Sequence, residues 1–138
     1  MKRRIVAAVL VALFPLGMAA CGSQSKADAC KEIEKAMNEA AEAMVSAAQD
    51  MTSNSNAQAS YNSIAEAYEA ASKKITNKEI KESVDQVAAG WRAAADNSGV
   101  LKADPMSMDV QKLEEYQKIM EDLNAKQTEL FNKCEFKH

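Results

Sequence analysis

The sequence predicts an all-α fold, an up-down-up-down four-helix bundle closed by a disulfide between the ends of its first and fourth helices. Three observations support this prediction. Apolar residues recur three and four residues apart through four long segments, which is the spacing of one helix face. These segments are rich in Ala, Glu, Lys and Met, which favour helices. No segment shows sustained alternation of period two, as a half-buried strand would.

The first two helices are expected on either side of a polar run at 52–56, whose composition is typical of a connection. The first is expected from about Asp28 to Met51, and the second from about Gln58 to Ile75. The apolar face of the first is formed by Cys30, Ile33, Met37, Ala40, Met44, Ala47 and Met51. The apolar face of the second is formed by Tyr61, Ile64, Tyr68, Ala71 and Ile75.

The third and fourth helices each follow a residue suited to capping a helix. The third is expected after Asn77, and the fourth after Asp104-Pro105, where an acidic cap precedes a proline in the first turn. The face of the third helix is formed by Ile80, Val84, Val87, Trp91 and Ala94. The face of the fourth is formed by Val110, Leu113, Met120, Leu123, Gln127, Leu130 and Cys134.

A leader precedes these helices. It begins with the basic run Lys2-Arg3-Arg4 and continues with the apolar stretch Ile5–Leu16, which is shorter than the roughly 20 residues that span a bilayer. Small residues in Met18-Ala19-Ala20 then precede Cys21, as a signal peptidase requires. Residues 1–21 therefore resemble the signal peptide and lipobox of bacterial lipoproteins, with Met18 where Leu is usual.

The resemblance covers residues 1–21 and implies that the Cys21 thiol is diacylglycerated and that signal peptidase II cuts before it. Residues 1–20 would be the signal peptide, 21–27 a lipidated tether and 28–138 the helical domain. Two or three acyl chains form a stable membrane anchor where one does not. The implied location is the outer face of the bacterial cytoplasmic membrane, or the outer membrane of a bacterium that has one. The alternative is an ordinary secretory peptide cut after Ala20.

With Cys21 committed to lipid, Cys30 and Cys134 remain as an even pair in an oxidising compartment, which predicts a disulfide. The alternative is two reduced, buried thiols. In an up-down-up-down bundle the first helix begins and the fourth ends at the same pole. A three-helix arrangement would separate these cysteines by tens of ångströms, beyond the roughly 4.4–6.8 Å between Cα atoms that a disulfide allows. The disulfide and the helix count therefore support each other.

The charge balance excludes one class of partner and orients the domain. Without the three basic residues of the leader, 14 basic and 20 acidic residues remain, a net charge of −6. Proteins that bind nucleic acid are normally basic, so nucleic acid is not expected as a partner. Nine lysines against seven acids fall in 26–35, 73–82 and 129–137, which should share the cysteine pole. This pole is predicted to face anionic headgroups; the alternative is that lysines gather at helix ends for solubility.

Candidate catalytic and metal sites are few. The only histidine is His138, so histidine-based metal binding and catalysis are not expected. No P-loop, nucleophile elbow or dinucleotide turn is present. Met106-Ser107-Met108 offers two thioethers to Cu(I), but a surface loop is the preferred explanation of the pair. The sequence therefore predicts no enzymatic activity, no cofactor and no metal.

Three functional hypotheses remain. The first is a membrane-anchored binding or regulatory lipoprotein that engages another envelope or extracellular protein. The second is an immunity or superinfection-exclusion lipoprotein that blocks a toxin or phage component. The third is a carrier of a small ligand or metal, which a cavity lined by Trp91, Tyr61 and Tyr68 would favour.

The connection 98–107 is the candidate docking site for a partner. It lies at the pole opposite the anchor and carries Val100, Leu101 and Met106, with Met108 just beyond. Loops on a rigid scaffold often bind partners, and apolar loop residues must either fold down or meet one. The alternative is that these side chains plug the end of the core.

Overall fold

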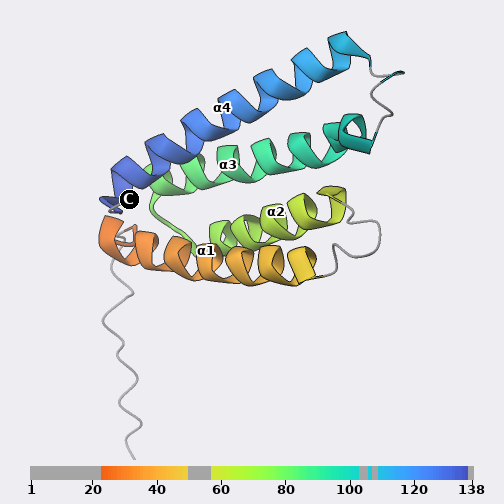
Figure 1. Cartoon of the computed structure of the whole chain (residues 1–138). Helices are drawn as coiled ribbons and strands as arrows, with labels where there is room; N and C mark the ends of the chain where they lie inside the picture. The colour runs from red at the N-terminus through yellow and green to blue at the C-terminus, as the bar shows by residue number, and fades with distance from the viewer. Residues whose placement is uncertain (1–22, 50–56, 103–105, 107–108, 137–138) are drawn as a thin grey trace, which may run out of the picture.

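The regular secondary structure of the described part of the chain is all helical, as the sequence predicts. The computed structural model describes residues 23–49, 57–102, 106 and 109–136. Within these residues there are four α-helices, one short 3-10 helix and no strand (Figure 1). In chain order they are α1 (Lys26–Gln49), α2 (Ala57–Lys74), α3 (Lys78–Asn97), η2 (Ser98–Lys102) and α4 (Val110–Cys134).

Each helix packs mainly on its neighbour in the sequence. α2 lies against both α1 and α3, and α3 lies against α4. α1 and α4 have few contacts with each other, and Figure 1 shows them diverging from the end where α1 begins and α4 ends. The packing is therefore a row of four helices whose outer members meet at one end.

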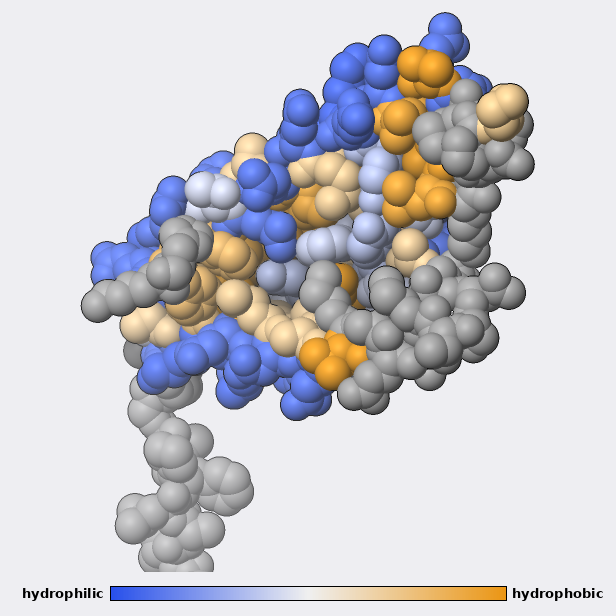
Figure 2. All heavy atoms as spheres, in the orientation of Figure 1, coloured by the Kyte–Doolittle hydropathy of each residue, from blue (hydrophilic) through white to orange (hydrophobic). Residues whose placement is uncertain are grey.

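The core lies along the middle of this row. Figure 2 shows hydrophilic side chains on the outer edges of the molecule and less polar side chains between them. α1, α2 and α3 each contribute buried alanines beside larger side chains, whereas α4 contributes only larger ones among its described buried residues. Small residues let α1 and α2 approach closely. The largest fully buried apolar side chains are Ile33, Ile64, Ile80, Val84, Val87, Leu123 and Leu130.

α3 and α4 make one especially close contact, at Gly90. A Cβ atom at this position would lie 2.8 Å from Leu123 Cδ1 and 3.4 Å from Leu123 Cβ. Both residues are buried, so Leu123 has little room to move aside. Glycine is used here because any larger residue would push α4 away from α3.

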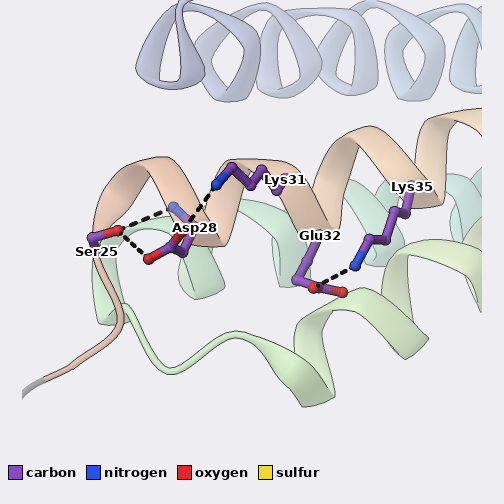
Figure 3. Close-up of polar contacts among 5 residues, drawn as sticks. All are labelled: Ser25, Asp28, Lys31, Glu32 and Lys35. Atoms are coloured by element: carbon purple, nitrogen blue, oxygen red, sulfur yellow. Dashed lines mark hydrogen bonds and ion pairs between the residues drawn. The ribbon is translucent and has the colours of Figure 1, made fainter. Parts of the chain in front are cut away.

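α1 begins at Lys26, two residues before the start expected from the sequence, and Ser25 fixes its first turn (Figure 3). Ser25 Oγ accepts a hydrogen bond of 3.1 Å from Asp28 N and donates one of 2.7 Å to Asp28 Oδ2. This is a form of capping box, with the acid three residues after the cap. The hydrogen bond from Ser25, followed by that from Lys31, lowers the pKa of Asp28. A charged Asp28 stabilises the positive end of the helix dipole.

The cap of α3 is the predicted one, whereas the cap of α4 is not. Asn77 caps α3 as predicted, since its side chain accepts a hydrogen bond of 3.1 Å from Ile80 N. The predicted start of α4 after Asp104-Pro105 is wrong, because the helix begins at Val110. Asp109 caps it by accepting hydrogen bonds from the backbone of Gln111 and Lys112. Residues 104 and 105 themselves lie outside the described residues.

α4 ends directly after Cys134. Glu135 adopts the left-handed conformation with φ 55°. Phe136 N then donates to Phe131 O at 3.1 Å, which is the six-residue hydrogen bond of a Schellman motif. The rings of Phe131 and Phe136 pack edge to face with centroids 5.9 Å apart. This local structure fixes the orientation of the last turn, which carries the cysteine.

The predicted disulfide between Cys30 and Cys134 is present. Their Cα atoms are 5.5 Å apart, and the bridge joins residues separated by 104 positions. Beside it, Gln24 is hydrogen-bonded to the connection between α2 and α3. Gln24 N donates to Thr76 Oγ1 at 2.9 Å, and Thr76 N donates to Gln24 Oε1 at 3.2 Å. The first described residues are therefore held against the bundle.

Replacing both bridge cysteines, Cys30→Ser with Cys134→Ser, should lower the free energy of unfolding by about 3 to 5 kcal/mol, because the bridge restricts the unfolded chain through a long loop. Helix content of the folded state should not change. Urea unfolding followed by circular dichroism measures both quantities. Wild-type protein in reductant is the control and should match the double variant. Equal stability with and without the bridge would contradict this prediction.

Candidate functional site

Two ends of the molecule carry different surfaces. The cystine end contains Cys30, Cys134 and the Gln24–Thr76 contact. A further contact places the start of α3 there, since Lys133 Nζ donates to Ser83 Oγ at 2.8 Å. The loop end contains η2, Met106 and the start of α4. The two ends are separated by the length of α3, which is about 30 Å for its 20 residues.

The loop end exposes apolar side chains. Leu101 is 50 % exposed, Met106 96 % and Val110 64 %, and Val45 in the C-terminal half of α1 is also exposed. Figure 2 shows hydrophobic side chains gathered at the end where α3 and α4 are joined. Scattered apolar residues are normal on a protein surface, but a group beside a connection is a candidate interaction site.

The structure divides the predicted docking residues between core and surface. Val100 is only 9 % exposed, and η2 packs against α2, α3 and α4. Ser98, also buried, donates from Oγ to Ala95 O at 2.7 Å and holds the start of η2. Val100 therefore plugs the end of the core, while Leu101 and Met106 reach the surface. Met108 and Cys21 lie outside the described residues.

A cleft of about 160 Å³ lies between α1 and α4, where these helices have diverged. It is lined by Met37, Ala40, Ala41, Ile64, Tyr68, Trp91, Gln127 and Phe131, so all four α-helices contribute. Trp91 is 7 % exposed, and its ring lies 5.4 Å from that of Tyr61. Because several elements converge on it, this cleft is better defined than a depression of about 420 Å³ whose described lining residues all come from α3.

The polar groups in and beside the cleft are neutral. The side chain of Gln127 forms a hydrogen bond with the Tyr68 hydroxyl, and the hydroxyls of Tyr61 and Tyr116 lie 3.0 Å apart. Burial raises the pKa of Tyr68. Burial also raises the pKa of Tyr116, and the hydrogen bond to Tyr61 raises it further. The phenols of Tyr68 and Tyr116 therefore stay protonated at neutral pH.

Arg92 has a structural role on the outer face of α2 and α3. Its Nε and Nη2 donate to the two carboxylate oxygens of Glu69 at 2.9 and 3.1 Å, and its Nη1 donates to Asn62 Oδ1 at 2.9 Å. A bidentate pair of this kind fixes the register of two helices. Both residues are partly exposed, so the pair contributes orientation more than stability.

The lysines at the cystine end fall into two groups. Four form ion pairs within their own helices, as Lys31 does with Asp28 at 3.3 Å. The other three of this group are Lys35, Lys81 and Lys133. Lys26, Lys73, Lys74 and Lys78 are exposed and make no ion pair within the described residues. They lie in the first turns of α1 and α3 and the last turn of α2.

Residues 23–49, 57–102, 106 and 109–136 contain no group of three or more histidine, cysteine or acidic side chains placed to hold a metal ion. None of the helices described is both long and apolar enough to cross a membrane. Comparison with models of known protein families, with curated proteins and with solved structures found no match.

The sequence pattern indicated some of these features and missed others. It placed Trp91, Tyr61 and Tyr68 on inward faces, and the structure gathers them around one region. It did not reveal the cleft, which depends on how far α4 diverges from α1. Nor did it reveal the contact of Gln24 with Thr76, because a glutamine in a short polar segment carries no distinctive signal.

Val100→Ser and Leu101→Ser should differ in stability although the two residues are adjacent. Val100→Ser should lower the free energy of unfolding by about 2 kcal/mol, because it removes a buried apolar side chain and leaves a hydroxyl in the core. Leu101→Ser, at an exposed position, should change it by no more than about 0.5 kcal/mol. Urea unfolding measures both. Equal losses would show that Leu101 also supports the core.

Proposed function

We propose that this protein is a lipid-anchored, non-enzymatic binding module of the bacterial cell envelope, whose loop end engages another envelope or extracellular protein. The observation that carries the proposal is the group of exposed apolar side chains, Leu101, Met106 and Val110, at the end remote from the N-terminal tether. The proposal includes a lipidated Cys21, because residues 1–21 resemble a lipoprotein leader. It does not include nucleic acid, a cofactor or a metal.

The proposed anchor lies close to the bundle. Gln24 is hydrogen-bonded to Thr76 and Asn77 at the cystine end. Only three residue steps separate it from Cys21, a reach of about 10 Å at most. A lipid on Cys21 would therefore keep the cystine end at the membrane and direct the loop end about 30 Å outward.

We further propose that the four helices form an up-down-up-down bundle, so that the starts of α1 and α3 and the ends of α2 and α4 share the membrane-facing pole. The contacts Cys30–Cys134, Gln24–Thr76 and Lys133–Ser83 support this arrangement. The exposed lysines in these turns, Lys26, Lys73, Lys74 and Lys78, would then lie near anionic headgroups, each contributing about 1 kcal/mol of attraction.

Cys21→Ser should abolish incorporation of a labelled fatty acid and release the protein from the membrane fraction, because the thiol is the proposed attachment point. Metabolic labelling and fractionation of cells measure this. The control is the double variant Cys30→Ser with Cys134→Ser, which should remain labelled because its Cys21 is intact. Wild-type protein that incorporates no fatty acid and is found outside the membrane would overturn the anchor.

The docking surface is tested by photo-crosslinking in living cells. A benzoylphenylalanine in place of Leu101 should give a discrete crosslinked species with an envelope or extracellular protein. The matched control carries the same residue in place of Gln86, which is exposed on α3 away from the loop end, and should not give that species. Identical crosslinking patterns from the two positions would exclude the loop end as the specific surface.

A further inference from the structure

The cleft between α1 and α4 follows from how the two helices are joined. The disulfide holds them together at Cys30 and Cys134, and they have few other contacts. α2 and α3, which lie between them in the row, form the floor of the cleft through Ile64, Tyr68 and Trp91. Figure 2 shows this face, with side chains of intermediate hydropathy exposed between two hydrophilic edges.

The lining favours a neutral ligand with an aromatic ring. None of the described lining residues is charged, so an ionic ligand would lose hydration without finding a partner. Three of them, Tyr68, Trp91 and Phe131, offer aromatic rings, and Met37 adds a thioether that packs well against ring edges. Ala40 and Ala41 leave space on the α1 side, because their side chains are short.

The volume limits the size of the ligand. An apolar cavity of about 150 Å³ accommodates benzene, and the cleft has about 160 Å³. The space inside the cleft therefore matches one ring with a short substituent, and any larger ligand would extend into solvent. Apart from Ala41, the lining residues are buried or half-buried. These described lining residues leave little apolar surface for a protein partner to cover, which favours a small molecule.

The polar atoms favour a hydroxyl on that ring. Gln127 has one hydrogen bond to Tyr68, and its amide has capacity for more. A ligand hydroxyl that reached this half-buried amide would use that capacity.

We propose that this cleft binds a small neutral aromatic alcohol or phenol with a single ring. The proposal goes beyond the function proposed above, because it depends neither on the lipid anchor nor on a protein partner at the loop end. Trp91 is the only tryptophan in the chain, so its fluorescence reports on the cleft without interference from other sites.

The test uses the mature chain with Cys21→Ser, which keeps every residue of the bundle and avoids detergent that would absorb the probe. Benzyl alcohol should change Trp91 emission saturably, with a dissociation constant on the order of 1 mM for so small a ligand. Cyclohexylmethanol, with a saturated ring of similar size, should bind several-fold more weakly. A linear change that does not saturate would overturn the proposal, and equal binding of the two alcohols would overturn the preference for an aromatic ring.

Two variants localise the effect. Ala40→Leu fills the cleft from the α1 side and should weaken benzyl alcohol binding at least tenfold. Ala41→Leu fills it from a more exposed position and should act in the same direction even if Ala40→Leu disturbs the fold. Ala125→Leu is the matched control, because Ala125 is exposed on α4 and is not among the lining residues. It should bind like the parent chain, and equal binding by all three variants would place the site elsewhere.

A last probe separates a free small molecule from the side chain of a partner protein. N-acetyl-phenylalaninamide carries the same ring without the hydroxyl, on a peptide backbone that would extend out of the cleft. It should bind more weakly than benzyl alcohol. Tighter binding of the peptide analogue would overturn the small-molecule proposal in favour of a protein side chain. None of these results alters the photo-crosslinking test of the loop end, so the two proposals fail independently.

Discussion

The bridge between Cys30 and Cys134 is the constraint on which the rest of the structure depends. α1 and α4 are the outer helices of the row and have few contacts with each other, so the disulfide is their main connection. A helix pair without extensive side-chain packing gains little stability from hydrophobic burial. The bridge compensates by joining the two ends of the domain, and the Schellman motif after Cys134 orients the turn that carries it.

The division of side-chain sizes explains why the row is asymmetric. Ala36 lies beside Ala70 and Ala71 where α1 meets α2, and Ala40 is too short to fill the space towards α4. On the other side, Gly90 lets α4 approach α3 closely through Leu123. α4 is therefore held to α3 along its length and to α1 only at the cystine end. The cleft is the space that this arrangement leaves unfilled.

The sequence could predict the features that depend on local pattern. The spacing of apolar residues predicted the four helices, the asparagine at position 77 predicted one cap, and the two cysteines predicted the bridge. It placed the start of α4 too early because Asp104-Pro105 and Asp109 are both acceptable caps. Local propensity cannot choose between two such caps, since tertiary packing decides which turn continues. Val100 is buried while its neighbour Leu101 is exposed because of the way η2 packs on the helices. A segment of five residues is too short for its hydrophobic pattern to predict which side chain points inward.

α4 links the cleft to the loop end through simple geometry. The disulfide fixes α4 at Cys134. Measured along the helix from Cys134, Gln127 in the cleft is about 10 Å away, and the first residue, Val110, is about 36 Å away. If the helix pivots as a rigid rod about the bridge, a shift at Gln127 becomes more than three times larger at Val110. The close contact of Gly90 with Leu123 opposes such a pivot, because it lies between these two points on α4. The packing of α4 on α3, of which this contact is one part, therefore holds the cleft and the loop end in a fixed relation to each other.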